Sequence, residues 1–332
     1  MATRVSIIGI TGYTGLELLR LLLAHPKVEI EHVTSRQHDG VSIGAVYPHL
    51  AHLDIQVTNP DLDKITADSD FVFLCLPHKT AQDTVAALHG KIKIIDLSAD
   101  FRLDDVETYE KHYNVPHIYP ELLKSSVYGL PEIIDHHKIA NASIVANPGC
   151  FALLSQMMLY PFAGAIESAD IMAITGSSGA GKTATDGTHH PVRNHNLKSY
   201  NINKHRHIPE ICRTAGIRAG QLNFVPTSGP FTRGIFATAF VKTKSGSMPK
   251  CADELYDGHK FVRVQDEVAL ANVVGSNFVD LNYQKIDDHN YIVQGAIDNL
   301  VKGAAGCAVQ NMNIMNGDNE TLGLLTLAPL YP

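Results

Sequence analysis

The chain has no tryptophan, few cysteines and no block of charge of a single sign. Its five cysteines are odd in number, widely scattered and form no C-x-x-C pair, which argues against both a disulfide framework and a zinc site. The 18 histidines show no metal-ligand spacing, so we expect no metal. A net charge of −7, spread along the chain, gives no reason to expect a nucleic acid or a membrane as a partner.

Long apolar runs are also missing, since none reaches the about 20 residues that cross a bilayer. The N-terminus leads directly into an apolar strand, without a basic region and cleavage site, so we expect no signal peptide. Unpaired cysteines favour the reducing cytoplasm as the location. The 332 residues, with a hydrophobic content of 45%, suffice for two domains with sizeable cores.

The first half of the chain alternates short apolar strands with helices. The predicted strands are 5–10, 28–33, 71–76 and 92–97, and the predicted helices are 16–24 and 81–88. This alternation implies right-handed crossovers and a mostly parallel sheet, as in an α/β protein. Ligands of such sheets bind beyond the carboxyl ends of the strands.

The second half has longer strands and few helices between them. The predicted strands are 171–175, 235–242, 278–283 and 291–297. They predict an α+β domain with a mixed, largely antiparallel sheet, whose apolar strands favour a homodimer or homotetramer. We place the domain boundary between residues 149 and 150. The helix-like run that begins near residue 299 is expected to pack back on the first domain, which would then comprise 1–149 and about 299–332, leaving 150–298 as the catalytic and oligomerisation domain.

A glycine-rich loop joins the first predicted strand to the first predicted helix. Gly9, Gly12 and Gly15 follow a G-x-x-G-x-x-G spacing, which lets the backbone turn tightly and approach a pyrophosphate at the helix N-terminus. In this context the pattern predicts a Rossmann-type dinucleotide-binding domain, the alternative being a plain tight turn. The expected cofactor contacts are Gly12, Tyr13, Thr14 and Gly15.

The residues after the second strand favour NADP(H) over NAD(H). An NAD-binding protein carries an acidic residue there for the ribose hydroxyls, whereas this chain has Ser35 and Arg36. A guanidinium offers a planar fork for a 2′-phosphate. The alternative is that Arg36 is a solvated loop residue.

Residues 176–183 satisfy the Walker A pattern and follow a strand, which makes a nucleoside triphosphatase the rival hypothesis. A true P-loop opens an amphipathic helix, but the segment after Thr183 has no apolar periodicity and contains Pro191. Among later strands, only Asp280 is suitably placed to hold Mg²⁺. We therefore expect the loop to wrap a dinucleotide or an oxyanion through its backbone N–H groups.

Cys150 is the candidate nucleophile. It follows an Asn-Pro-Gly turn and precedes an apolar, helix-like run, which places its sulfur at a helix N-terminus. The unpaired N–H groups and the positive end of the helix dipole there favour the thiolate. A buried structural cysteine is the alternative.

A polar cluster at 200–211 offers a base, in a segment whose composition is unsuited to a core. His205 and His207 flank an arginine, and a histidine can exchange protons with a thiol or a developing alkoxide. Tyr200 and Glu210 are the candidate supporting groups. The alternative is an exposed basic loop.

Three further residues are candidates to hold a phosphate or carboxylate of the substrate. Ser98 and Arg102 follow a strand at the ligand edge of the first sheet, and Arg233 precedes a strand of the second. Structural ion pairs are the alternative role for these arginines.

Together these motifs resemble N-acetyl-γ-glutamyl-phosphate reductase of arginine biosynthesis, in its longer form, within the aspartate-semialdehyde dehydrogenase-like superfamily. The resemblance covers nearly the whole chain. Its motifs are Gly12 to Leu18, Leu76-Pro77-His78, Asp96 to Leu103, Tyr128 to Glu132, Asn147 to Cys150, Ser178 to Gly181, His205 to Ile211, Arg233-Gly234-Ile235, Gly275-Ser276-Asn277 and Ile297 to Ala304.

The resemblance implies NADPH-dependent reduction of an acyl phosphate through a thioester on Cys150. It matches His205 to the family's acid/base histidine, although His207 is close enough to be the alternative. It also implies cofactor contacts at Pro77, at Ser178, Gly179 and Ala180 on the nicotinamide side, and at Asn311 beside Gln310. The same chemistry on a lysine-pathway analogue and a non-catalytic NADPH-binding regulator are the other hypotheses.

Two positions depart from the family pattern. Thr227 stands after Pro226 where the family usually has histidine, and Cys307 stands where it commonly has glutamine. Neither is the proposed nucleophile or base, so the departures concern the pocket wall and the far end of the substrate.

Overall fold

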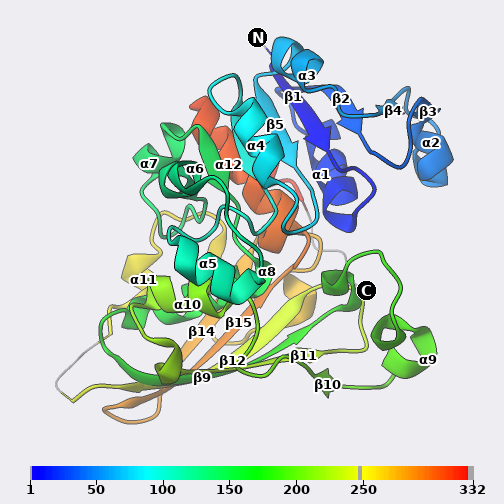
Figure 1. Cartoon of the computed structure of the whole chain (residues 1–332). Coiled ribbons are helices and arrows are strands. Elements are labelled where there is room, and N and C mark those ends of the chain that lie inside the picture. The colour runs from blue at the N-terminus through cyan, green and yellow to red at the C-terminus, as the bar shows by residue number, and fades with distance from the viewer. Residues whose placement is uncertain (1, 246–248, 328–332) are drawn as a thin grey trace. The chain divides into compact units, whose positions relative to one another are not determined.

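The computed structural model describes residues 2–245 and 249–327. The chain forms two compact units, of which the first comprises 2–147 and 305–324, and the second 148–304 and 325–327 (Figure 1). Residues 299–304 thus belong to the second unit, and 328–332 of the predicted C-terminal segment lie outside the described residues. Among the described residues, no helix combines the length and the hydrophobicity needed to cross a bilayer.

The first unit contains an eight-stranded sheet in the order β3-β4-β2-β1-β5-β6-β8-β7. All pairs are parallel except β3 with β4. Its central strands are short and apolar because helices cover both faces, and every residue of β5 is buried. The strands are β1 (Thr3–Ile8), β2 (Val28–Thr34), β3 (Val41–Ser42), β4 (Gln56–Thr58), β5 (Phe71–Leu74), β6 (Lys93–Asp96), β7 (Val127–Tyr128) and β8 (Ile144–Ala146).

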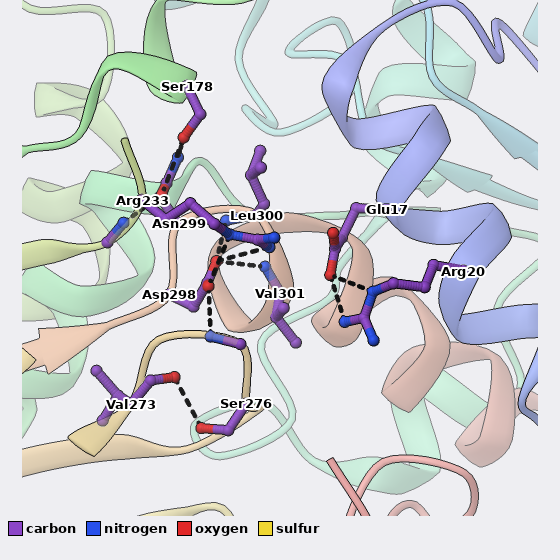
Figure 2. Close-up of polar contacts among 12 residues, drawn as sticks. Glu17, Arg20, Ser178, Arg233, Val273, Ser276, Asp298, Asn299, Leu300 and Val301 are labelled. Carbon is purple, nitrogen blue, oxygen red and sulfur yellow. Dashed lines mark hydrogen bonds and ion pairs between the residues drawn. The ribbon is translucent and has the colours of Figure 1, made fainter. Parts of the chain in front are cut away.

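The helices of this unit bury one apolar stripe each. In α1, Leu18, Leu21 and Leu22 are buried, and the buried Glu17 carboxylate accepts bonds from Arg20 at 3.1 and 2.5 Å (Figure 2). The C-terminal helix α12, red in Figure 1, packs beside α1 and α7. The helices are α1 (Tyr13–Leu23), α2 (Ile43–Val46), η1 (Pro48–Leu50), α3 (Leu62–Asp68), α4 (Gln82–Leu88), α5 (Val106–Tyr113), α6 (Pro120–Ser125), α7 (His136–Ala140) and α12 (Gly306–Asn316).

The second unit is built on a seven-stranded mixed sheet in the order β10-β11-β9-β12-β15-β14-β13. Its pairs β9–β11 and β13–β14 are parallel, and the others are antiparallel. The predicted fold class, a parallel sheet plus a largely antiparallel mixed sheet, is confirmed. The strands are β9 (Ile166–Thr175), β10 (Lys198–Ser199), β11 (Leu222–Ser228), β12 (Ile235–Thr243), β13 (Val262–Val264), β14 (Val279–Lys285) and β15 (Asn290–Ile297).

One face of this sheet is covered by α8, which packs against β12 and β15. Gly295 on β15 allows the close approach, since a methyl group there would lie 2.8 Å from Cδ1 of Leu154. The opposite face exposes apolar side chains, with Met172 46% and Phe240 55% exposed. The helices are α8 (Cys150–Leu159), η2 (Tyr160–Phe162), η3 (Ser177–Ala180), η4 (Asp186–Thr188), α9 (His190–Arg193), α10 (Ile208–Ala215), η5 (Ala219–Gln221), α11 (Ala252–Leu255), η6 (Leu270–Asn272) and the π-helix η7 (Val301–Ala305).

The predicted continuous helix from residue 299 is wrong in its first turn. Asp298 and Asn299 use their side chains to bond neighbouring loops, and the chain then forms the π-helix η7 before α12 begins. Strand β11 was not predicted because it contains Pro226, which favours an edge position. Pro226 is tolerated because the pairing of the short β10 ends beside it, at Thr227.

Candidate functional site

The three glycines of the loop between β1 and α1 have different structural roles. Gly9 has a φ of +101°, which makes the tight turn. A methyl group on Gly15 would lie 2.5 Å from the carbonyl oxygen of Gly9, so only glycine at this position allows the helix to pack closely on the strand. Gly12 precedes α1 and has no atom within 4 Å of its missing side chain. An anion can therefore approach the helix N-terminus at Gly12, which fits the pyrophosphate of a dinucleotide.

Tyr47, which the motif analysis missed, supports this loop. Its buried hydroxyl lies 3.2 Å from the carbonyl oxygen of Ile10 and 2.9 Å from that of Thr11. Burial raises the pKa of this hydroxyl, so it remains a donor. No sequence motif marks Tyr47, because the contact crosses more than thirty residues of chain.

The loop after β2 presents the two residues expected at a 2′-phosphate. Ser35 is buried, and its hydroxyl accepts the N–H of Gln37 at 3.1 Å. Arg36 next to it is exposed. The serine thus shapes the turn, while the arginine extends into solvent beyond the carboxyl end of the strand.

The loop after β5, which contains Pro77, is held by a carboxylate that the motif analysis missed. The buried Asp100 accepts the N–H of Lys79 at 2.7 Å and that of Ala81 at 2.9 Å, and the hydroxyl of Tyr109 at 3.0 Å. Pro77 itself is exposed at the end of the strand. Asp100 therefore fixes the backbone on which a cofactor contact at Pro77 depends.

Ser98 and Arg102 are buried and bond to their own unit. Ser98 donates to Asp96 at 2.7 Å, and Arg102 donates to the carbonyl oxygens of Asn147 at 2.8 Å and Leu97 at 3.1 Å. A substrate anion would have to compete with these bonds. The pKa of Asp96 is raised to about 7, mainly by burial, although the Ser98 bonds oppose the shift.

Asn311 and Cys307 lie in the interior of the first unit. Asn311 donates to the carbonyl oxygen of Gly129 at 2.9 Å and to the side chain of Asn147 at 3.2 Å, and the Cys307 thiol donates to the same Gly129 carbonyl at 3.3 Å. The Oδ1 atom of Asn311 has no hydrogen-bond partner among the described residues. Gln310 is buried beside them and donates to Glu132 at 2.9 Å.

In the second unit, Cys150 is the first residue of α8. Gly149 precedes it in extended conformation, and its carbonyl oxygen accepts the N–H of Leu153 at 2.7 Å. The buried Glu210 accepts the N–H of Gly149 at 3.1 Å, which fixes the turn. The half-buried Cys150 thus lies at the N-terminus of a helix, where the helix dipole stabilises a thiolate.

The two histidines lie against the residues that flank Cys150. Their ring centroids are 4.6 Å apart, and the ring of His205 is 5.3 Å from that of Phe151. A methyl group on Gly149 would lie 2.3 Å from Nε2 of His207, so only glycine leaves room for this ring. Both histidines are buried, which corrects the expectation that the segment is unsuited to a core, because aromatic rings enclose it.

His205 is held as a neutral imidazole with a defined tautomer. Burial and, to a lesser extent, the charge of Arg206 lower its pKa to about 4. Its Nδ1 atom accepts the backbone N–H of His207 at 3.2 Å, so the proton of the neutral ring is on Nε2. His205 therefore presents an N–H donor.

Tyr200 completes the cluster. Its ring lies 6.0 Å from that of His205. The pKa of its hydroxyl is raised to about 12, first by burial and then by the negative charge of Cys150. A protonated phenol near the sulfur is a second donor for a developing negative charge.

The loop of Ser178 is tied to the end of β15 and to the turn of Arg233. The side chain of Asn299 bonds Ser178 at 2.9 Å and accepts the N–H of Gly234 at 2.6 Å, while Asp298 pairs with Arg233 at 3.1 Å (Figure 2). Gly179 and Ala180 are exposed on this loop. Arg233 stays 21% exposed, so its guanidinium can still meet an anion.

The Walker-type sequence does not form a P-loop. After β9 it makes the short 3₁₀ turn η3 and then leads into the turns η4 and α9, not into a long helix. Asp280, the candidate Mg²⁺ ligand, is paired with Arg263 at 2.5 and 2.9 Å. Thr227, one of the two family departures, is buried on β11 and bonds the hydroxyl of Ser199 at 2.9 Å.

Comparison with known families covers both units. Residues 4–142 match the family model "Semialdehyde dehydrogenase, NAD binding domain", and residues 150–299 match "Semialdehyde dehydrogenase, dimerisation domain". A protein of Methanosphaera stadtmanae named N-acetyl-gamma-glutamyl-phosphate reductase is 42% identical over 99% of this chain and 98% of its own length. Proteins of the same name from Methanococcus maripaludis and Symbiobacterium thermophilum are 43% and 41% identical, over 96% and 100% of this chain and 97% and 100% of theirs.

Solved structures show the same fold at low sequence identity. The aspartate semialdehyde dehydrogenase of Candida albicans with NADP has a TM-score of 0.71 at 14% identity, covering 96% of this chain and 100% of its own. The aspartate semialdehyde dehydrogenase II of Vibrio cholerae complexed with ASA has a TM-score of 0.70 at 17% identity, covering 96% and 99%.

Proposed function

The chain belongs to the semialdehyde dehydrogenase family, and from that membership we propose that it reduces N-acetyl-γ-glutamyl phosphate to N-acetyl-L-glutamate 5-semialdehyde, with release of phosphate, in arginine biosynthesis. It is an oxidoreductase that uses NADP(H). The observation that carries the proposal is Cys150 at the N-terminus of α8, with His207 against Gly149 before it and His205 against Phe151 after it.

Cys150 is the proposed nucleophile. Its thiolate attacks the acyl carbon of the substrate, and the bond from that carbon to the phosphate oxygen breaks. Inorganic phosphate is released, and the acyl group stays on the enzyme as a thioester. The N–H groups at the start of α8 stabilise the sulfur anion before the attack. Covalent capture divides one difficult reduction into two easier steps.

Most of the proposed cofactor contacts belong to the first unit, and the Ser178 to Ala180 loop belongs to the second. The loop from Gly12 to Gly15 receives the pyrophosphate, and Arg36 with Ser35 accounts for the choice of NADP(H) through the 2′-phosphate. Pro77, Asn311 and the Ser178 to Ala180 loop remain the proposed contacts farther along the cofactor. When bound, the reduced nicotinamide supplies the hydride.

His205 is the proposed hydrogen-bond donor to the oxyanion. After reduction of the thioester carbon, its oxygen carries the negative charge, and the Nε2–H of the neutral ring donates a hydrogen bond to that oxygen without transferring the proton. Collapse of the thiohemiacetal anion reforms the carbonyl group and returns the thiolate. His207 supports this geometry by packing on Gly149, and Glu210 holds the N–H of the same glycine.

The acyl phosphate brings an anionic group beside the reacting carbon. Arg233 is the proposed residue for that group, because it is partly exposed and fixed in orientation. Ser98 and Arg102 are assigned a lesser role, because their bonds lie within their own unit and support the loops after β6 and β8.

We further propose that the protein is a homodimer that forms through the open face of the mixed sheet. Met172 on β9 and Phe240 on β12 expose large apolar surface on this face, and unpartnered apolar surface on a sheet marks an association site. The matched domain is described as a dimerisation domain. A cytoplasmic location follows from the need for a reduced thiol.

The reverse reaction provides the test of the function. Wild-type protein should reduce NADP⁺ in the presence of N-acetylglutamate semialdehyde only when phosphate or arsenate is added, and Cys150→Ser should lose nearly all turnover while still binding NADP⁺. Full activity of Cys150→Ser would refute the covalent role. Preference for a longer, lysine-pathway semialdehyde would transfer the same chemistry to another substrate.

A further inference from the structure

The buried carboxylate of Asp298 holds three segments of the second unit together. It is 0% exposed, and its Oδ1 atom accepts the N–H groups of Leu300 at 2.7 Å and Val301 at 3.0 Å. Its Oδ2 atom accepts the N–H of Gly275 at 2.7 Å and the Nε–H of Arg233 at 3.1 Å (Figure 2). A buried carboxylate is stabilised by such a set of donors, and each donor is in turn fixed in place.

One consequence concerns Cys150. The carbonyl oxygen of Asp298 accepts the N–H of Gly303 at 2.9 Å, five residues on, which closes a π-type turn that runs into the π-helix η7. This turn places Gly303 directly against the nucleophile, since a methyl group on Gly303 would lie 2.8 Å from Cβ of Cys150. The side chain of Asp298 caps the turn and its main chain closes it, so this residue determines what Cys150 packs against.

A second consequence concerns Arg233. The carboxylate pairs with the Nε side of the guanidinium at 3.1 Å and lies 3.4 Å from Nη2, which fixes the plane of the fork. Asn299, the next residue, accepts the N–H of Gly234 at 2.6 Å and so fixes the backbone beside that arginine. An anion-binding arginine held in this way loses little side-chain entropy when the anion binds.

We propose that Asp298 is a positioning residue for the reaction: it orients Arg233 toward the phosphate of the acyl phosphate and seats Cys150 through the π-turn. The proposal rests on the reductase function. We assign the phosphate of the substrate to Arg233, and not the carboxylate at the far end, because Asp298 is linked both to Arg233 and to the proposed nucleophile. In the substrate, the phosphate is bonded to the carbon that the nucleophile attacks.

The test compares Asp298→Asn with the wild type. An asparagine has the same shape but only one acceptor oxygen, so either the π-turn or the Gly275 and Arg233 donors lose a partner. We expect the KM for phosphate in the NADP⁺-reducing direction to rise about tenfold or more, and the rate of Cys150 alkylation by iodoacetamide to change severalfold. The dissociation constant of NADP⁺ should be unchanged.

Asp280→Asn is the matched control, because Asp280 is also buried, at 2% exposure, and also paired with an arginine, Arg263. It should lower stability without changing the KM for phosphate or the alkylation rate. Equal effects of the two substitutions, or no effect of Asp298→Asn, would overturn the proposal by reducing Asp298 to a structural residue.

Two further measurements keep the outcomes separate. If Asp298→Asn does not fold, Arg233→Gln should still raise the KM for phosphate about tenfold without changing Cys150 alkylation, and an unchanged KM would reject the role of the pair. If the wild type shows no phosphate-dependent NADP⁺ reduction, the reductase function fails. In that case the alkylation rates alone decide whether Asp298 seats Cys150.

Discussion

His205 combines burial, a fixed tautomer and a position against Phe151, the residue after Cys150. Because its pKa is lowered to about 4, the ring stays neutral down to pH values well below the ordinary range of histidine. The neutral ring therefore keeps its Nε2–H at neutral pH, as the proposed hydrogen bond to the oxyanion requires. The segment offered no sequence signal for this burial, since two histidines, an arginine and a glutamate are typical of an exposed loop.

The pH dependence of the reaction tests this assignment. We expect kcat/KM to show no acid limb near pH 6.5, because His205 protonates only as pH falls toward about 4. His205→Asn should lower kcat by roughly 10²- to 10⁴-fold with unchanged NADP⁺ binding. Steady-state rates between about pH 5 and 9 provide the measurement. A limb near 6.5 that disappears in His205→Asn would contradict the neutral-donor role.

The raised pKa of Asp96 predicts that the stability of the folded protein depends on pH. Its pKa is raised from 3.8 to about 7 in the folded state, so the folded state binds more protons than the unfolded state between these values. The free energy of unfolding should therefore decrease as pH rises from about 4 to 7, by up to about 4 kcal/mol. Asp96→Asn should flatten this dependence, as measured by urea unfolding at a series of pH values. An unchanged slope would show that another group is responsible.

At the scale of elements, the glycines of the strand–loop–helix unit at the start of the chain have two different roles, since one leaves room for a ligand and another allows the helix to pack on the strand. Gly12 faces open space, whereas Gly15 touches the backbone of Gly9. The glycine spacing and the strand before it predict this unit from sequence alone, because local turn geometry and apolar periodicity dictate it. Tyr47 and Asp100 could not be predicted in the same way, because their loop contacts depend on the tertiary fold.

Gly12→Ala and Gly15→Ala should affect different properties of the protein, the first cofactor binding and the second stability. A methyl group at Gly12 meets no protein atom but occupies the approach to the pyrophosphate, so we expect weaker NADP⁺ binding at unchanged Tm. A methyl group at Gly15 would lie 2.5 Å from a carbonyl oxygen, so we expect a lower Tm. Calorimetry of binding and thermal unfolding measure both. Normal NADP⁺ affinity in Gly12→Ala would contradict the binding of the pyrophosphate at this loop.

The elements that the sequence predicted well are those with a strong period. The strands at 235–242 and 291–297 lie within β12 and β15, because buried and exposed residues alternate along them. The π-helix η7 was missed because it depends on Asp298, whose side chain competes with the first turn of an ordinary helix. Competition of this kind between a side chain and the backbone is invisible to periodicity.

At the scale of the whole molecule, the chain divides where one kind of sheet gives way to another. The change from alternating strands and helices to long strands indicated this organisation, because each pattern reflects how many faces of a sheet are covered. The open face of the mixed sheet leaves Met172 and Phe240 exposed. Their exposure is unfavourable for an isolated unit and favours association.

Phe240→Asp should therefore shift the protein toward a monomer, because a charge at the centre of an apolar interface is costly to bury. Light scattering after gel filtration should show about half the wild-type mass at low protein concentration. Ile286→Asp is the control, since Ile286 is 57% exposed but lies in the turn after β14. Equal masses for wild type and Phe240→Asp would contradict association through this face of the sheet.

The π-turn also bears on where the chain tolerates changes in length. A π-helix holds one residue more than the α-helical turn it replaces, so a deletion within 299–305 would rotate everything downstream by about 100°. Every residue of α12 from Gly306 to Met315 is buried, so no rotated register of that helix is acceptable. The exposed stretch at 181–199 carries no such constraint. Insertions and deletions among natural variants should accordingly accumulate in that stretch, while the spacing between Asp298 and α12 stays constant.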